Sequence, residues 1–318
     1  MTSTKVLRIG TRGSRLALWQ AHAVADRLRA AGAETEIVVI RTTGDRSQVG
    51  SVIGDDSKRQ FVKEIEDALL RGDVDLAVHS AKDLPADLPA GLTLSACLPR
   101  EDPRDAIVLP KGVAVSDWPS VVQYLSSSES EEGSQIGTGS VRRIAQLRPL
   151  LPGVTFTPIR GNVDTRLNKL DAGGFHALVL ACAGLRRLGF ADRISFALPV
   201  DQCVPAPGQG IVATETRTAD HQSQAILDAV CDDEALEALE AERMLVKALG
   251  GNCQLPLGAL AMGKGAALEL HAVAASGDGS RAIRRVLRSH GGPPADVGRR
   301  LADDMLRAGA RELLDETG

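Results

Sequence analysis

Basic side chains recur where predicted β-strands end. Arg12 follows the first predicted strand, Lys82 follows the third, and Arg160 and Arg187 follow two strands in the second half of the chain. Ligands of open α/β sheets bind at the carboxyl ends of the strands, and the guanidinium group of arginine suits bidentate contact with carboxylates and phosphates. A single arginine in such a place is more commonly a solvated or ion-paired surface residue. Their recurrence at strand ends predicts a binding site for a polyanionic ligand.

A glycine-rich turn, Gly137-Thr138-Gly139-Ser140, precedes a predicted helix that carries Arg142 and Arg143 in its first turn. The unpaired backbone N–H groups at the start of a helix attract anions. The turn lacks the P-loop pattern, and residues 10–14 lack the glycine spacing of a dinucleotide-binding fingerprint. The turn is therefore a second candidate for anion binding, without a nucleotide signature.

Asp83 is an acidic residue among these basic candidates, directly after Lys82. Nearby positive charges favour the ionised form of a carboxylate. Two structural interpretations are open: a salt bridge to Lys82 or an arginine, and a turn-stabilising role before Leu84 and Pro85. The functional interpretation is an anion that stabilises a cationic intermediate while arginines hold the negative groups of the substrate.

The chain has 5 cysteines and no C-x-x-C pair, which fits neither a disulfide framework nor a zinc site, and no metal site is predicted. Cys97, Cys182, Cys203 and Cys231 lie beside apolar or small neighbours and are predicted to be core residues. Cys253 lies in the polar, glycine-rich turn of residues 250–254, where a thiol is predicted to be accessible. A functional thiol and an incidental loop cysteine both remain open at this point.

The elements that must position these residues follow an α/β pattern in the first two thirds of the chain. Predicted strands alternate with helices, which is typical of βαβ units on a mostly parallel sheet. Residues 100–104 form a predicted hinge between two such units, residues 41–58 a long loop, and residues 126–134 a polar surface insertion. From residue 234 onward we expect a small α+β domain with a helix, the Cys253 turn, two strands and a final helix. The predicted strands are 6–9, 37–40, 76–78, 92–98, 106–109, 155–159, 177–181, 268–274 and 283–289, and the main helices before residue 234 are 16–30, 61–70 and 163–170.

The composition is that of an ordinary soluble protein of two or three domains. The chain has 318 residues, of which 43% are hydrophobic and 25% charged, and its net charge of −4 indicates neither a nucleic-acid nor an anionic-membrane partner. Aromatic residues make up 3%, which argues against a single-strand nucleic-acid site built on stacked rings. No apolar run approaches the roughly 18 residues of a membrane span, and the N-terminal segment lacks the apolar stretch of a signal peptide. We expect a soluble, cytoplasmic protein.

Longer motifs carry a resemblance to a known family. The motifs are RIGTRGSRLALWQA from Arg8, AVHSAKDLP from Ala77, REDPRDA from Arg100, GTGSVRR from Gly137, RGNVDTRLNKL from Arg160, LACAGLRRLG from Leu180, PAPGQG from Pro205 and GGNCQLPLGA from Gly250. They follow one another along nearly the whole chain, and together they resemble the motifs of the porphobilinogen deaminases, also called hydroxymethylbilane synthases.

The resemblance implies an α/β fold of three domains. Two α/β domains like those of type II periplasmic binding proteins form a cleft, and a small C-terminal α+β domain completes the molecule. Domain 1 is expected to span 1–100 with a return segment at about 210–228, domain 2 is expected to span 104–204, and the C-terminal domain 231–318 is expected to carry the cofactor.

The resemblance also implies a transferase of porphyrin and heme biosynthesis. The family condenses four porphobilinogen molecules head to tail, releases ammonia at each step, and hydrolyses off the linear tetrapyrrole hydroxymethylbilane. A dipyrromethane cofactor, assembled from the same substrate, is expected on Cys253 through a thioether. Porphobilinogen is then the small-molecule partner, no nucleic-acid or membrane partner is implied, and a monomer is expected.

By the same resemblance, Asp83 matches the catalytic aspartate, which contacts pyrrole N–H groups and stabilises the cation formed as the amine leaves. Lys82 matches a cofactor-binding lysine, and the arginines match the groups that hold the acetate and propionate arms of each pyrrole. The expected cofactor- and substrate-binding residues are Arg12, Ser14, Lys58, Ser80, Lys82, Thr138, Gly139, Ser140, Arg142, Arg143, Arg160, Arg166 and Arg187.

The sequence departs from the family pattern at four places. Gly139 stands where serine is usual, so it offers a backbone N–H but no hydroxyl. Residues 55–60 read Asp-Asp-Ser-Lys-Arg-Gln in place of a Gly-Lys-Gly approach, so Lys58 aligns close to two acids. Thr216 replaces a cysteine, and Asn252 replaces a glycine before the expected cofactor cysteine, where asparagine tolerates the left-handed conformation.

Two alternatives remain open on the sequence alone. One is a ligand-binding protein on the same two-lobed fold, which would have no use for Cys253 or for a third domain. The other is an inactive family member altered in its long loop. The mass of the intact chain and its turnover separate them, because a binder carries no covalent dipyrrole and an inactive member carries one without turning over.

Overall fold

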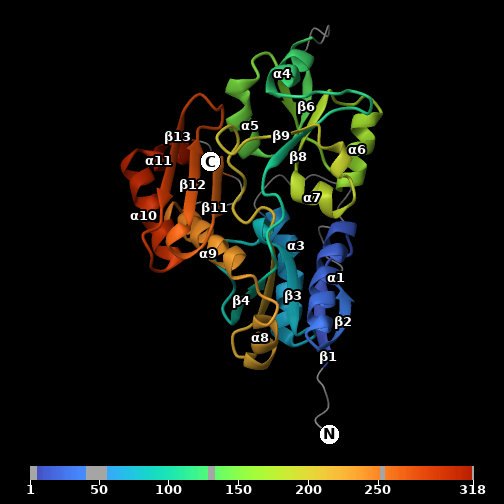
Figure 1. The fold of residues 1–318 in the computed structure, drawn as a ribbon, viewed down its shortest axis with the longest axis vertical. Helices are drawn as coiled ribbons and strands as arrows, with labels where there is room; N and C mark the ends of the chain where they lie inside the picture. The colour runs from blue at the N-terminus through green and yellow to red at the C-terminus, as the bar shows by residue number, and fades with distance from the viewer. Residues whose placement is uncertain (1–5, 41–55, 128–132, 251–254, 317–318) are drawn as a thin grey trace.

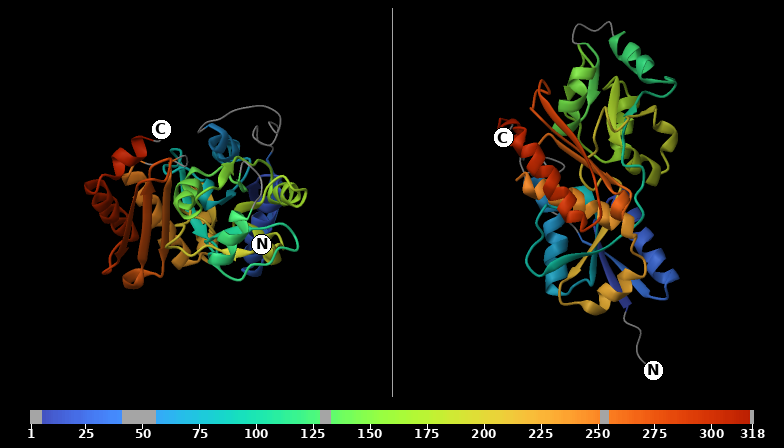
Figure 2. Two further views of the ribbon diagram at one scale, coloured as in Figure 1. Left: turned by 90° about the horizontal axis from the view of Figure 1, so that it is seen from above. Right: turned by 60° about the vertical axis from the view of Figure 1, so that its left-hand side comes forward.

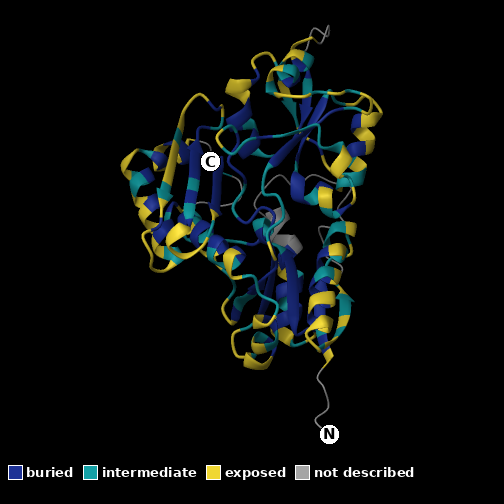
Figure 3. Ribbon diagram, in the orientation of Figure 1, coloured by how far each residue is buried: buried dark blue, intermediate teal, exposed yellow. Residues whose placement is uncertain are grey.

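The structure, a computed structural model, describes residues 6–40, 56–127, 133–250 and 255–316. Within them the chain forms three β-sheets with helices packed against them (Figure 1). The first sheet lies at the bottom of this view, the second at the top, and the third beside them. Buried residues concentrate in the central strands of the sheets (Figure 3). Among the described residues, no helix has the length and apolar character needed to cross a bilayer.

The first sheet is mixed and takes one strand from much later in the sequence. Strand β1 pairs in parallel with β2 and β3, whereas β10 runs antiparallel between β3 and β4. Helix α1 (Arg15–Ala30) packs on this sheet because Ala21, Val24 and Leu28 recur at helical spacing and are fully buried. The strand order is β2 (Glu34–Val39), β1 (Val6–Thr11), β3 (Leu76–Ser80), β10 (Val212–Arg217) and β4 (Leu92–Cys97), and helices α3 (Asp56–Arg71) and α8 (His221–Asp228) also contact the sheet.

The second sheet repeats this topology. Each sheet begins with three parallel strands that are consecutive in the sequence, and the earliest of the three lies between the other two. The fourth strand of each sheet comes from elsewhere in the sequence and runs antiparallel to its neighbour. The order here is β7 (Thr155–Thr157), β6 (Gln135–Gly137), β8 (Ala177–Ala181), β5 (Asp105–Val108) and β9 (Phe196–Ala197), with helices α4 (Trp118–Ser126), α5 (Val141–Leu147), α6 (Val163–Asp171) and α7 (Cys182–Arg187).

The C-terminal part forms a small antiparallel sheet with helices on one face. Figure 2 shows α9 and α10 lying side by side against it. Leu245, Leu270, Leu301 and Met305 are fully or almost fully buried between these helices and the sheet, so this part has its own core. The elements are α9 (Asp233–Ala248), β11 (Leu257–Met262), β12 (Glu269–Ala275), β13 (Ala282–Arg288), α10 (Pro294–Arg307) and α11 (Ala310–Asp315). The expected fold class is confirmed as α/β: the first two sheets form two α/β units with their helices, and the C-terminal part forms a small α+β unit.

Two segments, residues 98–104 and 198–211, cross between the first and second sheets and meet at Glu242 of α9. Nη1 of Arg100 donates to Oε1 of Glu242 at 2.6 Å, and the backbone N–H of Gly208 donates to Oε2 at 2.5 Å. The backbone N–H of Ala261 in β11 donates to Oε1 at 2.7 Å. A buried carboxylate needs such charge and hydrogen-bond partners, and here they tie both crossovers to the C-terminal sheet.

Three details of the sequence prediction are wrong. The sheets are mixed rather than mostly parallel, because β5 and β10 enter through crossovers that no local pattern reveals. The predicted loop 41–58 does not extend to its predicted end, since α3 begins at Asp56. The C-terminal part has a further strand, β11, and a further helix, α11; β11 has a Leu-Gly-Ala-Leu-Ala-Met sequence without the β-branched residues that indicate strands.

Candidate active site

Two loops at one edge of the first sheet carry the first candidates. Arg12 and Ser14 follow β1, and Ser14 caps α1 because its Oγ accepts a hydrogen bond from the backbone N–H of Ala17 at 3.3 Å. Lys82 and Asp83 follow β3 in a short 3₁₀ turn, η1 (Ala81–Asp83). Since β1 and β3 are parallel, both loops leave the sheet at the same edge.

The second sheet presents the glycine-rich turn after β6. Oγ1 of the buried Thr138 accepts a hydrogen bond from the backbone N–H of Ser140 at 3.3 Å. Ser140 in turn caps α5, since its Oγ accepts from the backbone N–H of Arg143 at 3.4 Å. Gly139 is exposed, and a Cβ atom there would meet nothing within 4 Å, so packing does not demand this glycine.

A cavity of about 350 Å³ lies between these two edges. Arg15 of α1 and Asp164 of α6 both line it and form an ion pair, with 2.6 Å between Nη1 and Oδ1, that links the two sheets. Cationic side chains outnumber acidic ones in the lining, which attracts a ligand with several negative charges. The candidates brought together here are Arg12, Ser14, Lys82, Asp83, Ser140, Arg142, Arg143 and Arg166.

A smaller cavity of about 30 Å³ adjoins this one and shares Lys82 with it. Ser80 and Arg187 line it. Oγ of Ser80 accepts a hydrogen bond from Nε2 of Gln20 at 2.7 Å, and the Arg187 guanidinium stacks on the ring of Trp19 at 5.3 Å. Two further candidates are therefore placed beside the main cavity.

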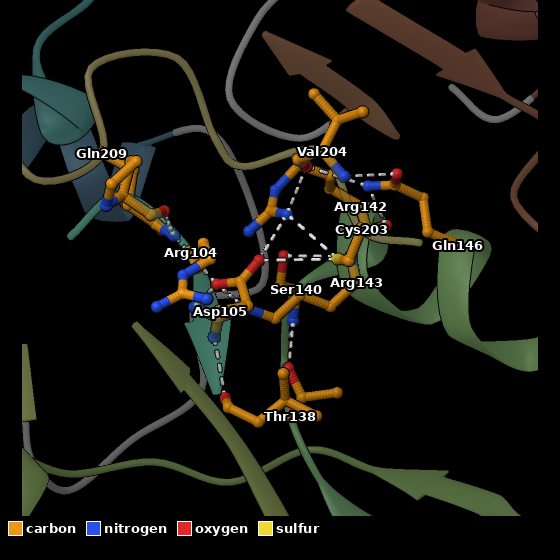
Figure 4. A network of polar contacts seen from close by, with 12 residues as sticks. Arg104, Asp105, Thr138, Ser140, Arg142, Arg143, Gln146, Cys203, Val204 and Gln209 are labelled. Carbon is orange, nitrogen blue, oxygen red and sulfur yellow. Dashed lines mark hydrogen bonds and ion pairs between the residues drawn. The ribbon is translucent and has the colours of Figure 1, made fainter. Parts of the chain in front are cut away.

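Arg142 and Arg143 are buried and share one carboxylate, that of Asp105 (Figure 4). Nη1 of Arg142 lies 2.7 Å from Oδ2 of Asp105, and Nη2 of Arg143 lies 2.7 Å from Oδ1. Burial alone would raise the pKa of Asp105, but the two guanidinium groups hold it well below its usual range. The carboxylate is therefore ionised, and the cluster of these three residues carries one net positive charge.

Arg166 and Arg187 differ from that pair, because neither has a carboxylate partner among the described residues. Arg166 donates to the carbonyl oxygen of Gly161 at 2.8 Å, and Arg187 donates to that of Gly210 at 2.6 Å. Burial lowers the pKa of Arg187 to about 10, and burial together with the nearby Arg143 lowers the pKa of Arg166. Nε of Arg187 is buried without a hydrogen-bond partner in the described chain. Half-buried cations of this kind are stabilised when an anion binds beside them.

Comparison with known families decides which family this chain belongs to. A family model described as the dipyromethane cofactor binding domain of porphobilinogen deaminase matches residues 7–225, and one described as the C-terminal domain of porphobilinogen deaminase matches residues 236–307. The chain belongs to the porphobilinogen deaminase family.

Relatives in this family match nearly the whole chain. The porphobilinogen deaminases of Roseiflexus castenholzii and Thiobacillus denitrificans are 43% identical to it over 312 and 313 residues, covering 97% of this chain and 98% of each relative. Among solved structures, the chain is similar to the periplasmic VFT2 domain of Bordetella pertussis BvgS, with a TM-score of 0.41 and 18% identity over 71% of this chain and 86% of that one. It is also similar to an ancestral arginine-binding protein bound to arginine, with a TM-score of 0.36 and 15% identity over 72% and 92%.

Asp83, the expected catalytic residue, is half-buried and lines the main cavity. Its side chain makes no hydrogen bond or ion pair within the described chain. The described residues therefore offer no partner for a salt bridge or for a turn-stabilising hydrogen bond, the two structural interpretations of this residue. Lys82 lies next to it in η1 and lines both cavities. The position suits a carboxylate that faces a ligand.

Among the family-matched positions that the structure describes, Thr138, Gly139 and Arg160 do not line the main cavity. Cys253 and its neighbour Asn252 lie outside the described residues. Lys58 belongs to α3, but its side chain also lies outside the described part. Arg160 is exposed.

The prediction that the four other cysteines are core residues is confirmed for three of them. Cys97, Cys182 and Cys203 are buried, and burial raises the pKa of each thiol to about 12. Cys231 is half-buried, and burial raises its thiol pKa as well. These thiols are therefore protonated and unreactive at neutral pH.

The sequence analysis missed Asp105 and Gln209. Both residues occur only within family motifs of the sequence, Asp105 in REDPRDA and Gln209 in PAPGQG, and neither is among the expected site residues. Nε2 of Gln209 donates to Oδ1 of Asp105 at 2.9 Å, and Gln209 lines both cavities. An available signal was that Asp105 directly precedes an apolar strand, where an unpaired acid would be costly and a partner must exist.

Proposed function

We propose that this protein is the enzyme that condenses four porphobilinogen molecules into hydroxymethylbilane. It is a transferase of tetrapyrrole biosynthesis, and each step forms one carbon–carbon bond between pyrroles and releases one ammonia. The observation that carries the proposal is the cavity between the two sheets, where arginines and a lysine surround Asp83 in a family member that matches its relatives over nearly its whole length.

The arginines bind the substrate's carboxylates. Porphobilinogen carries one acetate and one propionate, so each added unit brings two negative charges to the cavity. Arg12, Arg142 and Arg143 lie on the two facing edges and can engage arms of neighbouring pyrroles at once, and Arg166 and Arg187 offer guanidinium groups without a carboxylate of their own. A guanidinium gives two parallel hydrogen bonds to a carboxylate, which fixes the orientation of each ring.

Asp83 stabilises positive charge. As the amine of porphobilinogen leaves, the pyrrole becomes cationic, and an ionised carboxylate beside it lowers the energy of that state. Asp83 also accepts hydrogen bonds from pyrrole N–H groups. Because it has no partner in the described chain, its oxygen atoms are available for both tasks.

The dipyrromethane cofactor of this family fits the cavity's chemistry. A dipyrrole with two acetates and two propionates is a tetra-anion, and the described residues meet it with Lys82, Ser14, Ser140 and the arginines. Once bound, it supplies the pyrrole carbon to which the first substrate is joined. We assign its covalent attachment to Cys253, because this residue matches the family's cofactor cysteine. The other thiols are poorer candidates, since burial raises the pKa of Cys97, Cys182, Cys203 and Cys231.

The remaining assignments are part of the same proposal. Domain 1 comprises residues 1–100 with the return segment at about 210–228, domain 2 residues 104–204, and the cofactor-bearing domain residues 231–318. The enzyme acts as a cytoplasmic monomer. Lys58, Thr138, Gly139 and Arg160 complete the binding set by their match to the family's motifs.

Intact-mass spectrometry with a turnover assay tests this function. The purified protein should carry the mass of one dipyrrole, and it should convert porphobilinogen to hydroxymethylbilane with four ammonia molecules released per product. The bare chain mass with reversible ligand binding would instead identify a binding protein. A covalent dipyrrole without turnover would identify an inactive family member.

A further inference from the structure

Asp105 lies where both arginines of the glycine-rich turn and both crossovers between the sheets meet (Figure 4). It begins β5 directly after the first crossover and has no exposed surface. Gln209, in the second crossover, donates through Nε2 to Oδ1 of Asp105 at 2.9 Å and to the carbonyl oxygen of Pro103 at 2.7 Å. The carboxylate therefore joins the two crossovers to the arginine pair.

The two arginines are held in different ways. Arg143 donates through Nε and Nη2 to Oδ1 of Asp105, at 3.0 and 2.7 Å, and through Nη1 to the carbonyl oxygen of Val179 at 2.8 Å. Arg142 donates only through Nη1 within the described chain, to Oδ2 of Asp105 at 2.7 Å, to the carbonyl oxygen of Val204 at 2.8 Å and to Sγ of Cys203 at 3.6 Å. Both side chains line the cavity. A guanidinium has five N–H groups, so each arginine keeps donors beyond those that hold it.

We propose that Asp105 is a positioning residue, which orients the guanidinium groups of Arg142 and Arg143 so that their remaining N–H groups bind a carboxylate of the dipyrrole. It also reduces the charge of the pair from two to one, so two like charges are not buried side by side without compensation. This inference rests on the proposed function, because it assigns the arginine pair to the cofactor. Asp105 itself does not touch the ligand.

The experiment compares Asp105→Asn with a matched control, Asp75→Asn. Asp75 is also a buried carboxylate shared by two arginines: it lies 3.0 Å from Nε of Arg8 and 3.6 Å from Nη2 of Arg217. It precedes β3 and lies at the sheet edge opposite η1, away from the cavity. Both substitutions remove one buried negative charge next to two guanidinium groups, so both lower the melting temperature.

The deciding readout is cofactor loading. Apo-protein is incubated with porphobilinogen below the melting temperature of each variant, and intact mass follows the gain of the dipyrrole. We expect Asp105→Asn to load at least about tenfold more slowly than wild type, the effect of losing charge-assisted hydrogen bonds that orient the binding groups. Asp75→Asn should load at the wild-type rate despite its lower melting temperature.

A second variant, Asp105→Glu, keeps the charge but displaces the carboxylate by one methylene. Its melting temperature should lie closer to that of wild type than the melting temperature of Asp105→Asn does, because the charge is kept. It should still load the cofactor slowly, which separates the effect of arginine orientation from the effect of charge balance. Loading at the wild-type rate by Asp105→Asn, or by Asp105→Glu where the Asn variant does not fold, would overturn the inference. Failure of wild type itself to gain the dipyrrole mass would instead overturn the proposed function.

Discussion

Replacing Asp83 with asparagine should slow turnover severely and leave the fold intact. The side chain is half-buried in η1 and makes no hydrogen bond or ion pair within the described chain. Its loss therefore removes no structural contact there, and the free energy of unfolding should change by less than about 0.5 kcal/mol. The charge, in contrast, lines the cavity in which the proposed reaction would form a cationic pyrrole. Losing one preorganised electrostatic contact costs about 10²–10³ in rate, or roughly 3–4 kcal/mol of barrier.

The assay is single-turnover formation of product by holo-protein, with thermal unfolding measured on the same samples. Asp87→Asn is the matched control, because Asp87 lies in the same loop region and its side chain is 70% exposed. It forms an ion pair with Lys247 and does not line the cavity. It should turn over at the wild-type rate. Asp83→Glu keeps the charge and should retain part of the activity. If Asp83→Asn turned over normally and melted much lower, the carboxylate would be structural and the catalytic assignment wrong.

Four further outcomes are expected. Cys253→Ser should yield apo-protein with a lower melting temperature, since no bound anion stabilises the native state; a dipyrrole found on another cysteine would contradict the assignment. Arg187→Met should raise the KM for porphobilinogen about tenfold or more. The melting temperature of the apo-protein should change by less than about 4 °C, because the substitution loses one hydrogen bond but also removes a buried, poorly hydrated positive charge. A large fall in the stability of the apo-protein would show a structural role. Thiol alkylation at pH 8 should spare Cys97, Cys182 and Cys203 until the protein unfolds, as burial raises each pKa to about 12; rapid labelling of any of them would refute their burial. The contribution of Asp105 to the free energy of unfolding should be fully present above about pH 4 and be lost as the pH falls further, because its folded-state pKa lies below its unfolded value. A difference in unfolding free energy between wild type and Asp105→Asn that stays constant down to about pH 2 would contradict this.

Local patterns were sufficient to predict most elements that carry the site. The strand before Arg12, the helix capped by Ser14 and the strand before Lys82 all appear within two residues of their predicted bounds. Each is specified by its own hydrophobic period and its own cap. Arg12 and Lys82 line the same cavity for a related reason, since parallel strands place the residues that follow them at one edge, whereas Arg160 does not line it.

Pairing across the sheets could not be predicted in this way. β10 enters the first sheet from residues far along the chain, and its neighbours are set by the crossover rather than by its own sequence. The partner of Arg142 and Arg143 was missed for a related reason: Asp105 is distant in sequence and becomes adjacent only when β5 pairs with β8. The spacing of residues indicated an anion site at this turn, but only the structure shows that a protein carboxylate already occupies part of the guanidinium surface.

The two kinds of arginine in the cavity suggest how one site can bind a chain that grows by two negative charges per step. Arg142 and Arg143 are held by Asp105, so their geometry is set before a ligand arrives and little orientation entropy is lost on binding. Arg166 and Arg187 have no carboxylate partner in the described chain, and burial lowers the pKa of both. Much of their hydration has been removed on folding, so an arriving carboxylate meets cations in a medium of low dielectric, where the attraction is stronger than in water. In the proposed reaction, we expect the fixed pair to define where the first rings lie, and we expect the two arginines without a carboxylate partner in the described chain to supply the charge that later rings require.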